Sequence, residues 1–190
     1  MLHCVQHDNE DWGGMEGTSM IKRNSHCGWC GHEYEGDPPW PRRCSGCGHT
    51  SYLNPLPVAV ILVPVDNGVL AIRRTVAPEV GMLALPGGYI NLSETWQEAG
   101  AREVWEETGL RLDPAEIRDF AVLTADGYLL VFGLAASRTA ADLPPFTPTN
   151  ETSERVVLPG PADLAFSLHT QALAMYFERN AVAANRGEAK

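Results

Sequence analysis

The acidic residues of segment 87–110 have the clearest chemical potential in this sequence, because the segment contains five glutamates and one arginine. On a helix, Glu103, Glu106 and Glu107 would place all three carboxylates on one face. Like charges at this spacing repel by about 0.2–0.5 kcal/mol per pair, and a cation bound between them would reverse that sign. Carboxylate oxygens without Cys or His are typical ligands of Mg²⁺ or Mn²⁺. The triad therefore predicts a divalent-metal site, and a solvated acidic face balanced by Arg102 is the alternative.

Four cysteines form a second candidate site. They occur as two Cys-x2-Cys pairs, each followed by Gly-His: Cys27, Cys30, Cys44 and Cys47. Two such pairs complete a tetrahedral Cys₄ zinc site, and four thiolates leave no open position for water, so the zinc is predicted to be structural. The metal would replace the core that this Gly- and Pro-rich segment lacks. A rubredoxin-like iron site and disulfides are the alternatives, and a cytoplasmic location disfavours disulfides.

The N-terminal 25 residues are polar and show no hydrophobic period, so we expect residues 1–25 to be disordered or weakly ordered. His3, Cys4 and His7 in this tail could bind a metal. We interpret their grouping as incidental, because three such residues in a flexible tail form a weak motif.

A helix is predicted to position the glutamates. Thr95-x-x-Glu98 forms a capping box, and Gly109 suits the left-handed position just after a helix end, so the helix should span Trp96–Thr108. Its sheet-facing apolar stripe is expected to contain Ala101, Val104 and Trp105.

Strand patterns flank this helix on both sides. Before it, the apolar runs Leu56–Val65 and Val69–Arg73 are joined through Asn67-Gly68, which favours a two-residue hairpin. After it come three further strand candidates: Ile117–Thr124, Tyr128–Leu134 beyond the turn Asp126-Gly127, and Arg155–Leu158. A Pro-containing loop is predicted at Ala136–Asn150, and a closing helix at about Leu168–Asn185 with Ser167 as its N-cap.

The bulk composition is that of a soluble globular protein with a sizeable core: 190 residues, 44% hydrophobic and 20% charged. A net charge of −10 opposes binding to nucleic-acid phosphates. The longest apolar run is too short to span a membrane and contains prolines. No signal-peptide pattern is visible, so we expect a cytoplasmic protein without a membrane partner.

The acidic segment resembles a complete Nudix box. The matching positions are Gly88-x5-Glu94-x7-Arg102-Glu103-Val104-x-Glu106-Glu107-x-Gly109-Leu110. The resemblance covers about Pro57–Arg179. Together with the cysteine segment and the join Tyr52–Pro55, the chain is similar to the zinc-ribbon Nudix hydrolases, a group that includes NADH and FAD pyrophosphatases. Pattern and resemblance together imply an α/β fold: a Nudix α/β/α sandwich with a mixed sheet over residues 56–186, preceded by a small Cys₄ zinc ribbon over residues 26–55.

The resemblance implies a Mg²⁺-dependent (or Mn²⁺-dependent) pyrophosphohydrolase that uses water to cleave the diphosphate of a nucleoside diphosphate linked to another group. Glu106 and Glu107 would hold the metal, and Glu103 would be a further ligand or the base. Arg102 would orient these carboxylates, Glu94 would support the loop, and the backbone at Gly87 and Gly88 would contribute to metal binding.

Several points stay open on sequence alone. A loop carboxylate beyond the box, Glu151 or Glu154, would complete the site. FAD, ADP-ribose, NADH and dinucleoside polyphosphates are candidate substrates, although the motif of NADH pyrophosphatases is absent. Tyr128 lies where dinucleoside-polyphosphate hydrolases carry a tyrosine. Three other aromatic residues could stack on a base: Trp40, Tyr52 and Tyr89.

The expected partner is a small nucleotide rather than a nucleic acid, and the resemblance implies a homodimer. The alternative function is a non-catalytic, Nudix-like nucleotide sensor whose ribbon contacts another macromolecule. The complete carboxylate set disfavours a sensor, because a pure binder does not need three metal ligands and Arg102.

Overall fold

The computed structural model describes residues 23–125 and 127–185. The chain divides between Leu53 and Asn54 into two compact units. The grouped residues His3, Cys4 and His7, and the turn residue Asp126, lie outside the described residues. None of the described helices is long and apolar enough to cross a membrane.

The first unit is small and has little apolar core. Its strands β1 (Arg42–Arg43) and β2 (Thr50–Ser51) pair antiparallel. The buried cluster consists of Cys27, Tyr34 and Cys44. Buried Arg42 lies 4.3 Å from the Trp40 ring centre, so Trp40 packs within the unit. Since so few apolar residues are buried, packing alone gives this unit little stability.

The second unit contains two four-stranded sheets. The first is mixed, in the order β7 (Gly87–Tyr89), β3 (Leu56–Leu62), β9 (Tyr128–Leu134) and β8 (Arg118–Ala125); β3 and β9 run parallel and the other pairs antiparallel. The second is antiparallel, in the order β10 (Thr152–Leu158), β5 (Gly68–Arg74) and β4 (Pro64–Val65), with β6 (Leu83–Ala84) also pairing with β5.

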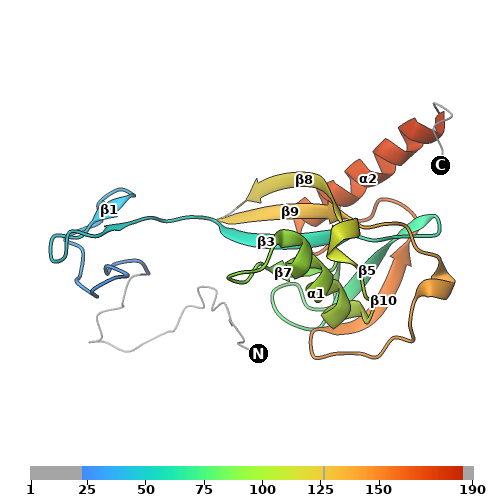
Figure 1. Ribbon diagram of the computed structural model, residues 1–190, viewed down its shortest axis with the longest axis horizontal. Helices are drawn as coiled ribbons and strands as arrows, with labels where there is room; N and C mark the ends of the chain where they lie inside the picture. Colours follow the sequence, from blue (N-terminus) through green and yellow to red (C-terminus); the bar gives the residue numbers. More distant parts are fainter. Residues whose placement is uncertain (1–22, 126, 186–190) are drawn as a thin grey trace. The chain divides into compact units, whose positions relative to one another are not determined.

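Two α-helices pack against the mixed sheet (Figure 1). Helix α1 (Trp96–Thr108) contacts β3 and β7, and helix α2 (Ser167–Asn185) contacts β8. The short 3₁₀ helices η1 (Pro114–Glu116) and η2 (Ala140–Asp142) lie in the connections. Mixed sheets combined with helices give the predicted α/β fold.

From Ala59 onward, strand β3 is buried on both faces. Val60 and Leu62 enter a core shared with β9 and α2, whereas Ile61 and Val63 enter a core on the α1 side. Successive side chains of a strand point to opposite faces, so a strand between two cores reads as a continuous apolar run.

The boundaries predicted for α1 are confirmed. Thr95 and Glu98 form a reciprocal capping box, and Gly109 has a φ of 75°. The predicted apolar stripe is wrong at one position: Val104 is fully buried, but Trp105 is 44% exposed. Trp105 lies about 100° further around the helix than Val104 and so faces away from the sheet.

The predicted hairpin is present, but its turn lies one residue earlier. Asp66 and Asn67 form the turn, whereas Gly68 pairs with Val65 as the first residue of β5. A Cβ atom at Gly68 would overlap the carbonyl oxygen of Leu158, so the glycine permits close approach of β10. The strand predicted as one run is divided at Val63 into β3 and β4.

Candidate metal-binding and catalytic site

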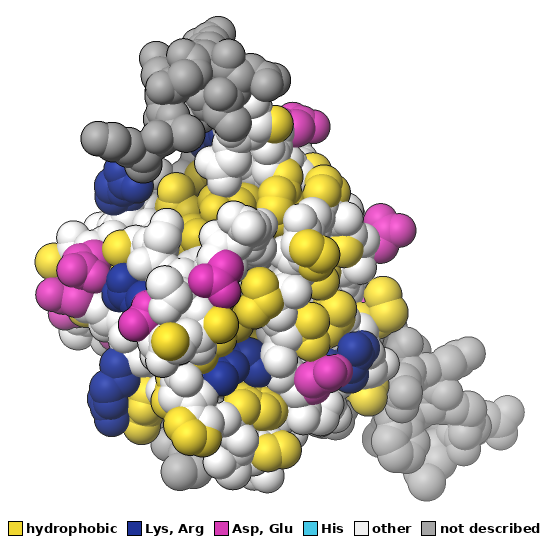
Figure 2. Space-filling view, turned by 90° about the vertical axis from the view of Figure 1, so that its right-hand side faces the viewer, with side chains coloured by type: hydrophobic (Ala, Val, Ile, Leu, Met, Phe, Trp, Pro, Cys, Tyr) yellow, Lys and Arg dark blue, Asp and Glu magenta, His cyan; other side chains and the backbone are white. Residues whose placement is uncertain are grey.

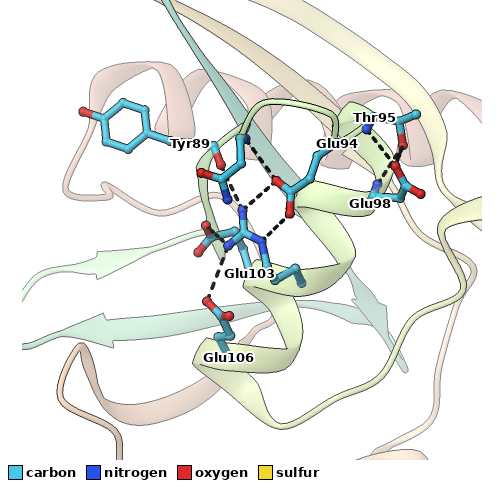
Figure 3. Close-up of polar contacts among 8 residues, drawn as sticks. Tyr89, Glu94, Thr95, Glu98, Glu103 and Glu106 are labelled. Carbon is cyan, nitrogen blue, oxygen red and sulfur yellow. Dashed lines mark hydrogen bonds and ion pairs between the residues drawn. The ribbon is translucent and has the colours of Figure 1, made fainter. Parts of the chain in front are cut away.

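Arg102 is the centre of a charged network between α1 and the loop before it. Its partners Tyr89, Glu94, Glu103 and Glu106 are labelled in Figure 3. Its Nε and Nη2 donate to the two carboxylate oxygens of Glu94 at 2.8 and 3.1 Å. Its Nη1 donates to Glu103 at 2.6 Å and lies 3.4 Å from Glu106. Nη2 also donates to the carbonyl of Tyr89 at 3.0 Å. One guanidinium therefore ties the end of β7, the following loop and the helix together.

These contacts set the charge states of the network. The guanidinium hydrogen bonds hold the pKa of Glu94 below its usual value, and Glu94 in turn raises the pKa of Arg102. Both groups stay ionised at neutral pH. Because a bidentate arginine–carboxylate pair has a fixed geometry, Arg102 acts as a positioning residue for the glutamates around it.

Glu107 is the most deeply buried member of the triad, with 6% of its surface exposed. Its Oε2 accepts a hydrogen bond from the Gly87 N–H at 3.0 Å. Burial raises the pKa of Glu107 well above 4.5, and the charges of Glu103 and Glu151 raise it further. The charge of Arg74 opposes this shift without cancelling it, so the ionised carboxylate is only partly compensated at this place in the fold.

The other two glutamates differ from Glu107 in their surroundings. Glu103 is mostly buried and the burial raises its pKa, although Arg102 opposes the shift. A Cβ atom at Gly88 would overlap the Glu103 carboxylate, so a larger residue there would have to displace that side chain. Glu106 is about half exposed. The three glutamates thus share one helix face as predicted, but they differ in how deeply they are buried.

The carboxylates do not form a ready-made coordination shell. In residues 23–125 and 127–185, only the four cysteines form a group of at least three His, Cys, Asp or Glu side chains with all ligand atoms within 4.8 Å of one another. Arg102 instead draws the carboxylates of Glu103 and Glu106 toward itself. The donor set still fits a hard divalent cation, because a cation beside buried Glu107 would supply the missing positive charge.

Two further charged residues, one of them absent from the prediction, approach the glutamates from the second sheet. Arg74 ends β5, where it pairs with Thr152 of β10, and the Thr75 N–H donates to the Glu151 carbonyl at 3.0 Å. Arg74 lowers the pKa of Glu107, whereas Glu151 raises it. Only the pairing of β5 with β10 brings these residues near α1. The sequence therefore contained no indication that Arg74 belongs to the site, beyond its place at the end of a predicted strand.

The two candidate loop carboxylates, Glu151 and Glu154, have different surroundings because only Glu154 lies within β10. Strand β10 begins at Thr152, earlier than predicted, and Glu154 on it pairs with Arg73 at 2.6 Å. Glu151 precedes the strand, and its charge reaches both Glu103 and Glu107. Of the two, Glu151 is therefore the one whose charge acts on the buried glutamates of the candidate site.

The four cysteines converge as predicted. The Sγ atoms of Cys27 and Cys47 lie 3.9 Å apart, and those of Cys30 and Cys44 lie 3.7 Å apart. A tetrahedron with Zn–S bonds of about 2.3 Å has S···S edges of about 3.8 Å. Disulfides are not formed, since an S–S bond measures about 2.05 Å. The cluster therefore fits a tetrahedral metal ion.

Local backbone geometry supports the two cysteine turns. Gly31 and Gly48 follow the second cysteine of each pair, and both have a φ of 73°. Their N–H groups donate to the carbonyls of Cys27 and Cys44, each at 2.9 Å. N–H groups of Cys30 and Trp29 donate to the Cys27 sulfur and lower its pKa to about 6. The fold thus favours a thiolate at Cys27, the form that binds metal.

The aromatic candidates occupy different environments. Tyr89 and Tyr128 approach each other with ring centres 6.5 Å apart, at the ends of β7 and β9. Tyr52 is 66% exposed in the small unit. Trp40 lies under Arg42, so its ring already has a packing partner.

Comparison with known proteins gives a match to one family model. Residues 54–157 match the NUDIX domain. Over 100 residues, the chain is 29% identical to the NAD-capped RNA hydrolase NudC of Escherichia coli O1:K1 / APEC, an alignment covering 52% of this chain and 38% of that protein. The chain thus spans well under half of the length of the curated relatives it matches.

Solved structures show the same architecture. A NUDIX hydrolase from Nitrosomonas europaea superimposes with a TM-score of 0.66 at 27% identity, covering 81% of this chain and 90% of that one. A bifunctional NMN adenylyltransferase/ADP ribose pyrophosphatase from Francisella tularensis, complexed with AMP and a Mn ion, gives a TM-score of 0.52 at 19% identity, covering 71% and 42% of the two chains. The second likeness supports the fold alone.

Proposed function

Because this chain belongs to the NUDIX domain family, we propose that it is a divalent-metal-dependent hydrolase. Its substrate would be a nucleoside diphosphate linked to another group, such as FAD, ADP-ribose, NADH or a similar dinucleotide. Water would attack one phosphorus of the diphosphate, and the P–O bond to the bridging oxygen would break.

The observation that carries this proposal is the environment of Glu107. A buried carboxylate with two acidic neighbours is costly to maintain unless a cation balances it. A divalent cation does so and also attracts the phosphates of an anionic substrate. This explains how a protein of net charge −10 would bind a nucleotide diphosphate.

We assign metal binding to Glu103, Glu106 and Glu107, with the backbone at Gly87 and Gly88 beside them. Bound Mg²⁺ or Mn²⁺ would neutralise phosphate charge and lower the pKa of water. Arg102 holds Glu103 and Glu106, and Glu94 holds Arg102 against the loop. These ion pairs hold Glu103 and Glu106 at the guanidinium, and a bound cation would compete with Arg102 for the two carboxylates.

A carboxylate must accept the proton of the attacking water. Glu103 suits this role because burial raises its pKa, which brings a base closer to the working pH. Glu151 is the second candidate, as its charge acts on both buried glutamates. Glu154 is excluded from our proposal by its ion pair with Arg73.

Arg74 is proposed to bind the substrate diphosphate. Its guanidinium lies 4.9 Å from the centre of the Phe166 ring, and its Nε donates to the Pro78 carbonyl at 3.0 Å. These contacts fix an arginine at the end of β5 whose charge reaches Glu107. A preorganised guanidinium there would stabilise charge on the phosphate oxygens.

The four cysteines are proposed to hold structural zinc, because the first unit has too small an apolar core to be stable without a metal.

We propose a small nucleotide as the partner. On the face shown in Figure 2, acidic and basic side chains are interspersed with hydrophobic ones, so its described residues form no continuous basic track for a nucleic-acid backbone.

Product analysis by mass spectrometry tests the function directly. The protein would be incubated with FAD, NADH, NAD⁺, ADP-ribose, diadenosine polyphosphates and NAD-capped RNA, with and without Mg²⁺ or Mn²⁺. Metal-dependent cleavage supports the proposal, and product masses identify the broken P–O bond. Binding without turnover, from folded protein that holds zinc, would instead favour a nucleotide sensor.

A further inference from the structure

His169, near the start of helix α2, is a buried ionisable residue that the proposed mechanism does not use. Only 6% of its surface is exposed. Its Nδ1 accepts a hydrogen bond from the Leu85 N–H at 3.3 Å. Since Nδ1 is the acceptor, the neutral ring carries its proton on Nε2. Leu85 is buried and follows the last paired residue of β6, so the imidazole is the acceptor for a buried N–H just beyond that strand.

Two aromatic side chains hold the orientation of this imidazole. Phe132 of β9 and Phe166 meet it edge to face, with ring centres 5.8 and 5.0 Å from its own. The Ala165 N–H also donates to the Leu83 carbonyl at 2.7 Å. The start of α2 is therefore joined by hydrogen bonds to the backbone on both sides of Ala84.

Leu85 is two residues from the backbone group that holds Glu107. The Gly87 N–H donates to Glu107 Oε2 at 3.0 Å. Between the two, Pro86 has a restricted φ, and its carbonyl accepts from the Ile61 N–H at 2.9 Å. So short and constrained a connection passes a displacement of Leu85 on to the Gly87 N–H. A shift of that N–H would turn the buried carboxylate that is bonded to it.

Phe166 also connects the start of α2 to Arg74. The Arg74 guanidinium lies 4.9 Å from the centre of the Phe166 ring, and the Arg74 backbone N–H donates to the Met82 carbonyl at 3.0 Å. These contacts do not pass through the imidazole. A change at His169 should therefore affect the Glu107 side of the site more than the Arg74 side.

We propose that His169 is a positioning residue of the hydrolase: it holds Leu85, and through segment 85–87 it orients the Glu107 carboxylate for the cation. This inference rests on the proposed function. It gives helix α2 a role in metal binding, although all the side chains that we assign as metal ligands lie on α1.

The test compares His169→Leu with His169→Asn. Leucine fills the apolar surroundings but offers no acceptor, whereas the asparagine Oδ1 lies close to the position of Nδ1 and can accept from the Leu85 N–H. Steady-state kinetics would be measured over a range of Mg²⁺ concentrations, below the Tm of each variant, with the substrate that the wild type cleaves fastest.

His169→Leu should raise the Mg²⁺ concentration for half-maximal activity by about 10- to 100-fold, which is the typical effect of losing a residue that orients a metal ligand. The KM for the substrate at saturating Mg²⁺ should change little, because Phe166 still holds Arg74. His169→Asn should restore most of the Mg²⁺ affinity, since it restores the acceptor.

A matched control is Leu173→Val, which shortens a fully buried side chain one turn further along α2. It should lower the Tm and leave the Mg²⁺ requirement unchanged. An unchanged Mg²⁺ requirement in His169→Leu would overturn the proposal. Equal increases in His169→Leu and Leu173→Val, or in His169→Leu and His169→Asn, would also overturn it, because the loss would then follow stability or packing rather than the acceptor.

Nitrogen-15 NMR of the labelled wild-type protein tests the hydrogen bond without any variant. At neutral pH, an unprotonated Nδ1 and a protonated Nε2 on His169 support the proposal. A protonated Nδ1 contradicts it, because that nitrogen could not accept from the Leu85 N–H.

Failure of the hydrolase proposal has a separate signature, because the wild-type protein would then cleave no substrate. The role of His169 is still testable in that case by the rise in Tm on addition of Mg²⁺. A smaller rise in His169→Leu than in both the wild type and His169→Asn supports the proposal. Equal rises in the three proteins, or no rise in any, contradict it.

Discussion

Replacing Glu107 by glutamine should stabilise the protein in the absence of Mg²⁺ while removing its metal response. Burial raises the pKa of Glu107 in the folded state above its unfolded value of 4.5. A raised carboxylate pKa contributes stability at a pH below 4.5, and this stability is lost as the pH rises through the folded pKa. Glutamine keeps an oxygen for the Gly87 N–H and never ionises, so it avoids that loss.

The size of the effect at pH 7 has an upper bound. The unfolded carboxyl is ionised over 2.5 units, from 4.5 to 7. At about 1.36 kcal/mol per unit this gives about 3 kcal/mol at most. A domain of this size gains about 2–4 °C in Tm per kcal/mol. We therefore expect a gain of up to about 3 kcal/mol, which corresponds to a rise in Tm of several degrees.

Differential scanning calorimetry on zinc-loaded protein dialysed free of Mg²⁺ would measure this difference. The gain should vanish below pH 4.5 and grow between pH 4.5 and 7. Added Mg²⁺ should raise the Tm of the wild type by mass action and leave Glu107→Gln nearly unchanged. Glu106→Gln is the matched control for the measurement without Mg²⁺. Because Glu106 is about half exposed, the Tm of this variant should differ little from that of the wild type.

A Glu107→Gln variant that is less stable than the wild type at pH 7 without Mg²⁺ would refute the reasoning. It would mean that the charged form of Glu107 is stabilised by the fold alone. The proposed need for a cation would then lose its physical basis.

Three further predictions follow from other parts of the structure. Arg74→Gln should lower kcat/KM in steady-state kinetics by about 10- to 100-fold, as expected for the loss of one hydrogen bond to a charged group. Arg73→Gln is the control, and its kcat/KM should stay near the wild-type value because Arg73 pairs with Glu154. Cys30→Ser should bind no zinc, whereas the wild type should bind one zinc ion per chain as measured by atomic emission, and the small unit of the variant should unfold. A full zinc equivalent in this variant would contradict the Cys₄ site. Burial lowers the pKa of His169 from 6.5 to about 3, so the stability that its neutral form contributes above pH 6.5 should be lost as the pH falls toward 3. By pH 4.5 the loss should be about 3 kcal/mol, and urea titrations of His169→Gln should lack this pH dependence.

The ends of α1 and the family of the chain could be predicted from the sequence because their causes are local. The capping box joins Thr95 to Glu98 within one turn, and Gly109 supplies a positive φ without a side-chain clash. The spacing of Glu103, Glu106 and Glu107 fixes a common helix face. The two Cys-x2-Cys turns are equally local, and their sulfurs converge as predicted.

Tertiary packing decided what each of those residues experiences. Glu107 is buried and Glu106 is half exposed because α1 packs against β3 and β7 along one side only. The register of β10 on β5 brings Glu151 and Arg74 toward the helix and turns Glu154 to Arg73. Such contacts join residues far apart in the chain, so sequence spacing carries no information about them. The sequence determined the helix and the carboxylates on its face, whereas the packing of two sheets against α1 decided which carboxylates are buried and what surrounds them.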